Sequence, residues 1–310
     1  MSFTIALSNV LLTLFYILPG YAICKMKKVN KDHLGSLSGV LVYACSPCMI
    51  LSSFLSMDFS VDHLWKMGIF FVLTLILQCL FMGGLYLLFR KKYEDSRYRL
   101  LTIGAVMGNV GFFGLPIIKA LLPTHPEVLC YSSIYAVTMN LLAFTVGVFC
   151  LTGKKEDMRP RAALINPSSL TFALVALPLY ILGGRHFLPS LLVGGIDLLG
   201  KMSTPLCMLI LGVRLATVSL PKLFARPAVY LISAAKLLAF PLFIFGATCF
   251  LPLDFAMKAS IVILSATPCA SLIFNLAEIH HSEEELSANC MLVSTLICFL
   301  TIPLFTLLVR

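Results

Sequence analysis

The sequence predicts an all-α polytopic membrane protein with ten transmembrane helices in two inverted five-helix repeats. Hydrophobic residues occupy 59% of its 310 positions and charged residues only 12%, whereas soluble domains carry roughly 25% charged residues. The apolar residues form runs of about 20 residues, the length that crosses a bilayer as a helix. Two of these runs are interrupted by glycine, asparagine and proline. Length and composition give the class, and the interruptions indicate where a site lies.

Ten apolar runs are long enough to be spans. They lie at 5–24, 34–56, 64–89, 98–122, 127–151, 168–185, 196–216, 227–251, 254–278 and 286–309. No basic region precedes the first run, so we interpret it as a retained helix rather than a signal peptide. The connecting loops are short, and the longest polar stretch, 152–161, leaves no room for a soluble domain.

Basic residues predict the orientation of the spans. Lys and Arg concentrate at 25–31, 90–99, 154–161 and 214–226, in alternate connections. The positive-inside rule makes these connections cytoplasmic and puts both termini outside, in a multi-pass protein of the plasma membrane. The same rule explains the excess of Lys and Arg without nucleic-acid binding. One connection predicted to be cytoplasmic, 278–285, is acidic, but acids weigh little in the rule.

The ten spans divide into five and five around a cytoplasmic linker. The predicted units are a first repeat at 1–151, the linker at 152–165 and a second repeat at 166–310. An odd number of spans per unit forces the two units into opposite orientations, as in many secondary transporters. Prolines fall in corresponding spans of the two units. The pairs are Pro19 with Pro178, Pro47 with Pro205, and Pro116 with Pro268.

The fourth and ninth spans contain the interruptions. Residues 108–116 read GNVGFFGLP, and residues 265–271 read SATPCAS. Proline removes an amide donor and glycine loosens the backbone. Unpaired backbone in hydrocarbon costs several kcal/mol per group, so such breaks survive only where protein or water covers them. Two broken helices at corresponding positions predict a transport site.

Two helix starts have local signals. Asn166 followed by Pro167 predicts an N-cap and first helical residue for the sixth span. Ser282 with Glu285 three residues later predicts a capping box that opens the tenth span. Both pairs lie next to polar connections.

Several motifs together resemble the auxin efflux carrier family, in its bacterial-type branch related to plant PIN auxin carriers, within the bile-acid and arsenite transporter group. They are SPCMIL at 46–51, GNVGFFGLP at 108–116, NP at 166–167, TPLCMLILG at 204–212 and TPCA at 267–270. The resemblance implies that spans four and nine cross at Pro116 and Pro268, with substrate beside the crossing. It also implies a scaffold half, a moving transport half, and carboxylate substrates such as malate, malonate or auxin. The chain lacks the long central loop of the plant carriers, which disfavours auxin.

Polar residues within the spans are the remaining candidates. Lys236 lies at the centre of span eight, where a charge rarely faces lipid. It either faces the substrate cavity or bonds to carbonyls freed by a broken helix. Gln78 lies at a corresponding position of span three. Asp197 and Lys201 are four residues apart and can pair, as a structural pair, a cavity rim or a coupling-ion site. Lys119 either snorkels or lines the site.

The balance of charge predicts the substrate class. Apart from Asp197, no carboxylate falls near mid-membrane. Lys236 and the positive ends of the half-helices do lie there, so an anionic substrate fits better than a cationic one. The predicted substrate-binding residues are Asn109, Gly111, Pro116, Thr267, Pro268, Asn275, Lys236, Pro47 and Gln78.

The predicted function is therefore alternating-access transport of small mono- or dicarboxylates, with a membrane receptor of organic acids as the alternative. An enzyme is not expected, because no H-E-x-x-H motif occurs and no serine–histidine pair falls at membrane depth. No cofactor or metal site is predicted, since Glu278, His280, His281 and Glu283 form a solvated loop. The coupling ion (H⁺, Na⁺ or none) and the oligomeric state stay open, and a homodimer is compatible with the sequence.

Overall fold

The structure, a computed structural model, describes residues 2–158 and 160–309, and over these ranges the chain is built of helices. Seven helical segments are long and apolar enough to cross a membrane, and the segments 110–121, 167–181 and 255–265 are shorter apolar helices. The prediction of an all-α polytopic membrane protein is confirmed. The division into two inverted five-helix repeats stays a prediction.

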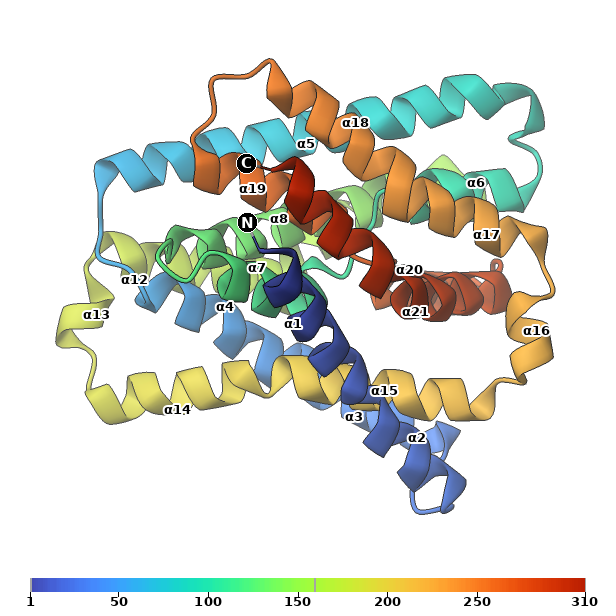
Figure 1. Cartoon of the computed structure of the whole chain (residues 1–310), viewed down its shortest axis with the longest axis horizontal. Coiled ribbons are helices and arrows are strands. Elements are labelled where there is room, and N and C mark those ends of the chain that lie inside the picture. The colour runs from blue at the N-terminus through green and yellow to red at the C-terminus, as the bar shows by residue number, and fades with distance from the viewer. Residues whose placement is uncertain (1, 159, 310) are drawn as a thin grey trace.

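In Figure 1, α5 lies along one edge of the molecule and α14 with α15 along the opposite edge, while α1, α17, α18 and α21 run obliquely between them. In chain order the α-helices are α1 (Phe3–Phe15), α2 (Ile17–Lys25), α3 (Leu34–Val40), α4 (Ser46–Leu55), α5 (Val61–Phe89), α6 (Ser96–Gly104), α7 (Leu115–Leu121), α8 (Glu127–Leu142), α9 (Val148–Thr152), α10 (Pro160–Ile165), α11 (Pro167–Thr171), α12 (Leu177–Ile181), α13 (Gly184–Phe187), α14 (Ser190–Lys201), α15 (Ser203–Thr217), α16 (Leu220–Phe224), α17 (Pro227–Ala234), α18 (Phe240–Cys249), α19 (Phe255–Ser265), α20 (Ser271–Ile279) and α21 (Glu284–Leu308).

Four of the prolines within the spans are preceded by wide, π-helical turns. Four such turns each end two residues before a proline. They are η2 (Leu41–Cys45) before Pro47, η4 (Val110–Gly114) before Pro116, η7 (Phe172–Ala176) before Pro178 and η8 (Ala235–Ala239) before Pro241. Proline has no N–H, and its ring clashes with the carbonyl one turn earlier. A wider turn relieves the clash while the helix continues, so proline alone does not break these spans.

Helices α2 and α15 cross with their backbones in contact. A Cβ atom on Gly20 would lie 2.2 Å from the carbonyl oxygen of Leu209, and one on Gly212 would lie 2.1 Å from that of Ile17. Small residues allow this approach, which is common where helices pack inside a membrane. Because backbone atoms lie opposite both glycines, no side-chain movement can make room for a larger residue.

Contacts between connections define the two ends of the bundle. At the end that carries the 152–165 linker, which we call the linker end, the Ser282 hydroxyl donates to the Leu151 carbonyl over 2.7 Å and the Ser96 hydroxyl donates to Glu283. At the other end, which we call the opposite end, the Ser60 amide donates to the Tyr180 hydroxyl over 3.1 Å.

The two predicted helix starts have different outcomes. The Asn166 side chain accepts from the Ser168 amide and Pro167 is the first residue of α11, so this N-cap is confirmed. The capping box at Ser282 is wrong, because α21 begins at Glu284 without a side-chain cap. The Ser282 hydroxyl is instead used to join the ends of two spans.

Candidate functional site

The interruptions of the fourth and ninth spans pair with each other. The backbone amide of Asn109 donates to the Pro268 carbonyl over 2.8 Å, and the backbone amide of Ala270 donates to the Met107 carbonyl over 3.1 Å. Gly108 and Cys269 thereby form an antiparallel bridge between segments far apart in the sequence. Each break thus supplies hydrogen-bond partners that the other has lost, which removes a cost of several kcal/mol per group. We call the paired segments 107–109 and 268–270 the crossover.

Gly108 allows the close approach. A Cβ atom at this position would lie 2.4 Å from the Thr267 hydroxyl oxygen and 3.0 Å from the Lys236 ammonium nitrogen. The Thr267 hydroxyl is itself fixed, because it donates to the Leu264 carbonyl over 2.7 Å. Any larger residue at position 108 therefore forces the two breaks apart.

Lys236 lies behind the crossover. Its side chain is fully buried, and its ammonium donates to the Ser265 carbonyl over 2.6 Å, at the C-terminus of α19. The nitrogen also lies 4.9 Å from the centre of the Phe240 ring. A cation at a helix C-terminus offsets the negative end of the helix dipole. This geometry matches the alternative in which Lys236 bonds to carbonyls freed by a broken helix.

Gln78 is also buried away from the break. Its amide nitrogen donates to the Thr138 hydroxyl over 3.1 Å, which joins α5 to α8. Its amide oxygen is buried without a partner among the described residues. Neither Gln78 nor Lys236 is among the residues that line the cavities described next.

A small cavity of about 120 Å³ lies beside the crossover, and we call it the crossover cavity. Of the predicted site residues, Asn109, Gly111 and Asn275 line it. Its polar side chains are four amides and four hydroxyls. They belong to Asn109, Asn140, Asn166, Asn275, Ser46, Ser133, Ser168 and Ser271. Among the described residues, none that lines this cavity carries a charge, so it is polar and neutral.

The other predicted residues lie around this cavity. Pro268 belongs to the crossover and Thr267 contacts Gly108, but neither lines the cavity. Pro47 adjoins Ser46, which does line it. Pro116 lines a separate cavity toward the opposite end. Sequence reasoning did not select Asn166 or Ser168 as site residues, although the helix start at Asn166 was a local signal of a polar group at that position.

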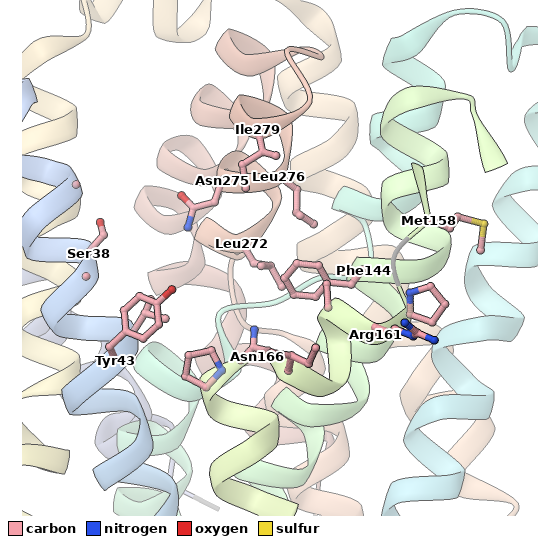
Figure 2. Close-up of a pocket in the computed structure, with 17 residues that line it drawn as sticks. Ser38, Tyr43, Phe144, Met158, Arg161, Asn166, Leu272, Asn275, Leu276 and Ile279 are labelled. Atoms are coloured by element: carbon pink, nitrogen blue, oxygen red, sulfur yellow. The ribbon is translucent and has the colours of Figure 1, made fainter. Parts of the chain in front are cut away.

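A larger cavity of about 960 Å³ leads from the linker end to the crossover. Figure 2 shows Asn275 and Leu272 of α20 between Tyr43 on one side and Phe144 and Arg161 on the other. We call this space the linker cavity. It shares four lining residues with the crossover cavity, namely Val42, Asn166, Leu272 and Asn275. The linker, predicted only as a connection, contributes Arg161 to its wall.

Two half-helices begin at the crossover cavity. The helical segment Val110–Leu121 follows Asn109, and α20 follows Ala270, and neither start has a side-chain cap. Val110 and Gly111 from one start and Ser271 and Leu272 from the other line the cavity. The first amides of a helix have no intrahelical acceptor and carry partial positive charge. The cavity therefore presents two positive helix ends and, among its described lining residues, no carboxylate.

Replacing the lysine behind the crossover is expected to weaken the fold more than the binding of a ligand. We expect Lys236→Gln to lower the melting temperature in detergent, because loss of the ammonium leaves the buried Ser265 carbonyl without its donor, at a cost of about 1–3 kcal/mol. Ligand affinity should change less than in Asn109→Ala, since Lys236 does not line the cavity. A larger loss of affinity in Lys236→Gln than in Asn109→Ala would place the lysine in the binding site.

Comparison with known proteins identifies the family of this chain. The sequence pattern of the family described as "Membrane transport protein" matches residues 5–306. The chain is 23% identical over 310 residues to an uncharacterized transporter of Methanocaldococcus jannaschii, covering 97% of this chain and 98% of the relative. It is 26% identical over 308 residues to an uncharacterized transporter of Methanothermobacter thermautotrophicus, with 96% of each chain covered. The chain therefore belongs to the membrane transport protein family, the auxin efflux carrier-like family that its motifs resemble.

Proposed function

We propose that this protein is a secondary transporter of small organic anions, mono- or dicarboxylates such as malate or malonate, which moves them across the plasma membrane by alternating access at the crossover. One observation carries the choice of an anion. Two uncapped helix starts meet at a neutral cavity of amides and hydroxyls, without a carboxylate among the described lining residues. Helix N-termini bind anions through free amides and through the helix dipole.

The lining also fits a carboxylate in its chemistry and size. Amide NH₂ groups and hydroxyls donate hydrogen bonds, and bonds to an ionised acceptor are the stronger ones. The side chain of Asn109 is available for this role, because among the described residues its side-chain amide nitrogen makes only a long contact of 3.9 Å with the Cys207 sulfur. Pockets for drug-sized ligands measure about 300–1,000 Å³, so a cavity of about 120 Å³ fits an acid of a few carbons.

The test is uptake of radiolabelled malate and malonate into proteoliposomes. We expect saturable uptake by the unmodified protein and a loss of kcat/KM of about tenfold or more in Asn109→Ala. Losing a hydrogen bond to a charged group costs about 1.5–3 kcal/mol, and 1.4 kcal/mol is a factor of ten. Asn30→Ala is the matched control, because this exposed amide lies in a connection outside the three cavities. It should transport at the unmodified rate.

Contrary outcomes separate the parts of the proposal. Full uptake in both Asn109→Ala and Asn275→Ala, two amides that line the crossover cavity, would move the site away from the crossover. Absence of uptake for every carboxylate by the unmodified protein would favour the receptor alternative. Assays with and without Na⁺ and a pH gradient identify coupling. Uptake that responds to neither is uniport, which a cavity without a titratable lining group favours.

A further inference from the structure

A third cavity lies toward the opposite end of the bundle, on the far side of the crossover cavity from the linker cavity. It has a volume of about 220 Å³ and lies between α1, α4, α7, α8, α14 and α15. We call it the opposite-end cavity. Its lining includes the amide of Asn9, hydroxyls such as those of Thr13 and Ser52, and three charged side chains. Polar groups at membrane depth are costly unless they face water or one another, so this lining indicates an aqueous space.

Met49 of α4 separates the opposite-end cavity from the crossover cavity. It is the one residue shared by the two linings among the described residues. Its methyl group would lie 3.1 Å from a Cβ atom on Gly111, and its Cα would lie 2.9 Å from one on Gly200. Met49 is therefore packed between the broken helix and α14. The three cavities follow one another from the linker end to the opposite end, and Met49 forms the wall that the second and third have in common.

The opposite-end cavity has one cation in excess. Asp197 has both carboxylate oxygens engaged, one by the Ser52 hydroxyl at 3.0 Å and one by the Lys201 ammonium at 2.5 Å. The predicted pairing of Asp197 with Lys201 is thus confirmed. Lys119 has no carboxylate within 4.0 Å among the described residues. The aspartate neutralises one lysine, and Lys119 is left to attract an anion.

We propose that the opposite-end cavity is a second binding site for the transported carboxylate, with Lys119 as its counter-ion and Met49 as the barrier toward the crossover. This inference rests on the proposed function. A carboxylate that leaves the crossover past Met49 reaches Lys119, which follows Pro116 by three residues on the same half-helix. The flexible, uncharged thioether can change rotamer without breaking an ion pair. A lysine that served only to contact water or lipid would not need a cavity that shares a wall with the crossover cavity.

The experiment measures the two faces of the protein separately. Intact expressing cells and inverted membrane vesicles present opposite faces to labelled malate or malonate. We expect Lys119→Gln to raise KM about fivefold from one face and to leave KM from the other face within about twofold. Arg161→Gln, which alters the linker cavity, should show the reverse pattern and is the matched control. Lys119→Arg keeps the charge and should keep the unmodified KM.

Each outcome has one meaning. No carboxylate uptake by the unmodified protein would overturn the proposed function itself. Uptake with an unchanged KM from both faces in Lys119→Gln would overturn only the second site. Lys119→Gln could be inactive from both faces while Lys119→Arg is active. Equilibrium dialysis of the purified variants with labelled malate then shows whether the second site is lost. A loss of one bound malate per chain supports the second site, and no loss overturns it.

Lysines of this kind also bind lipid phosphates, and the lipid composition of proteoliposomes distinguishes the two ligands. An effect of Lys119→Gln on KM in vesicles of pure phosphatidylcholine supports the carboxylate. An effect that occurs only in vesicles containing phosphatidylglycerol would assign Lys119 to a lipid headgroup and overturn the proposal.

Discussion

Gly108→Ala is expected to lower carboxylate uptake about 100-fold while the protein still inserts into the membrane. The added methyl group would lie 2.4 Å from the Thr267 hydroxyl oxygen, far inside the contact distance of about 3.5–4.0 Å. Relief requires the two breaks to separate, which lengthens the hydrogen bond from Asn109 to Pro268. Overpacking typically costs 1–3 kcal/mol, and about 3 kcal/mol corresponds to about 100-fold. Uptake of labelled malate into proteoliposomes measures the effect.

A second substitution shows whether the clash is the cause. Thr267→Ala removes the hydroxyl that the new methyl group would meet. Uptake by the double variant Gly108→Ala/Thr267→Ala should therefore be about tenfold higher than uptake by Gly108→Ala alone. Neighbouring groups that share one contact give such non-additive effects. Gly83→Ala is the control, because nothing lies within 4 Å of its Cβ position on α5. Equal uptake in Gly108→Ala and Gly83→Ala would show that the crossover tolerates displacement.

Gly20→Ala is expected to destabilise the whole bundle by about 3 kcal/mol. The new Cβ would lie 2.2 Å from the Leu209 carbonyl oxygen and 2.9 Å from the Leu209 Cα. Since these are backbone atoms, helices α2 and α15 must move apart along their crossing. The measurement is the melting temperature of the detergent-solubilised protein, compared with the unmodified chain.

Two companion variants make this result specific. Gly212→Ala lies on the other side of the same crossing and should lower the melting temperature similarly, and the double variant should lose less than the sum. Gly246→Ala has nothing within 4 Å of its Cβ position and should be neutral or slightly stabilising, because alanine favours a helix by about 1 kcal/mol over glycine. A melting temperature unchanged in Gly20→Ala would contradict the direct backbone contact.

The positions of the helices could be predicted from sequence because the signals are local. Apolar length predicts a span, and the composition of 108–116 and 265–271 predicts a loss of helix at those places. The structure ends α6 at Gly104 and α19 at Ser265, and it starts α20 at Ser271. Proline alone was a weak predictor of a break in a helix. At Pro47, Pro178 and Pro241 the helix continues through a wide turn, and only glycine-rich or otherwise weakened segments open fully.

The membership of the site was only partly predictable. Asn109 and Asn275 were selected because they are amides near the breaks, and both line the crossover cavity. Lys236 was selected on its depth in the membrane, but depth does not give the direction of a side chain. The structure turns it toward the carbonyl end of α19. The sequence placed Arg161 in the cytoplasmic linker, and its position in the wall of the linker cavity depends on how α10 packs.

The sequence by itself determined that this is a helical membrane protein, where its breaks lie and which family it belongs to, because hydropathy, proline and glycine act within a few residues of themselves. Only the tertiary structure decided that the breaks pair, that Lys236 lies behind them and that Met49 divides two cavities. These features join segments more than 100 residues apart, as when Asn109 meets Pro268. Such contacts depend on close packing between helices, for which no local pattern exists.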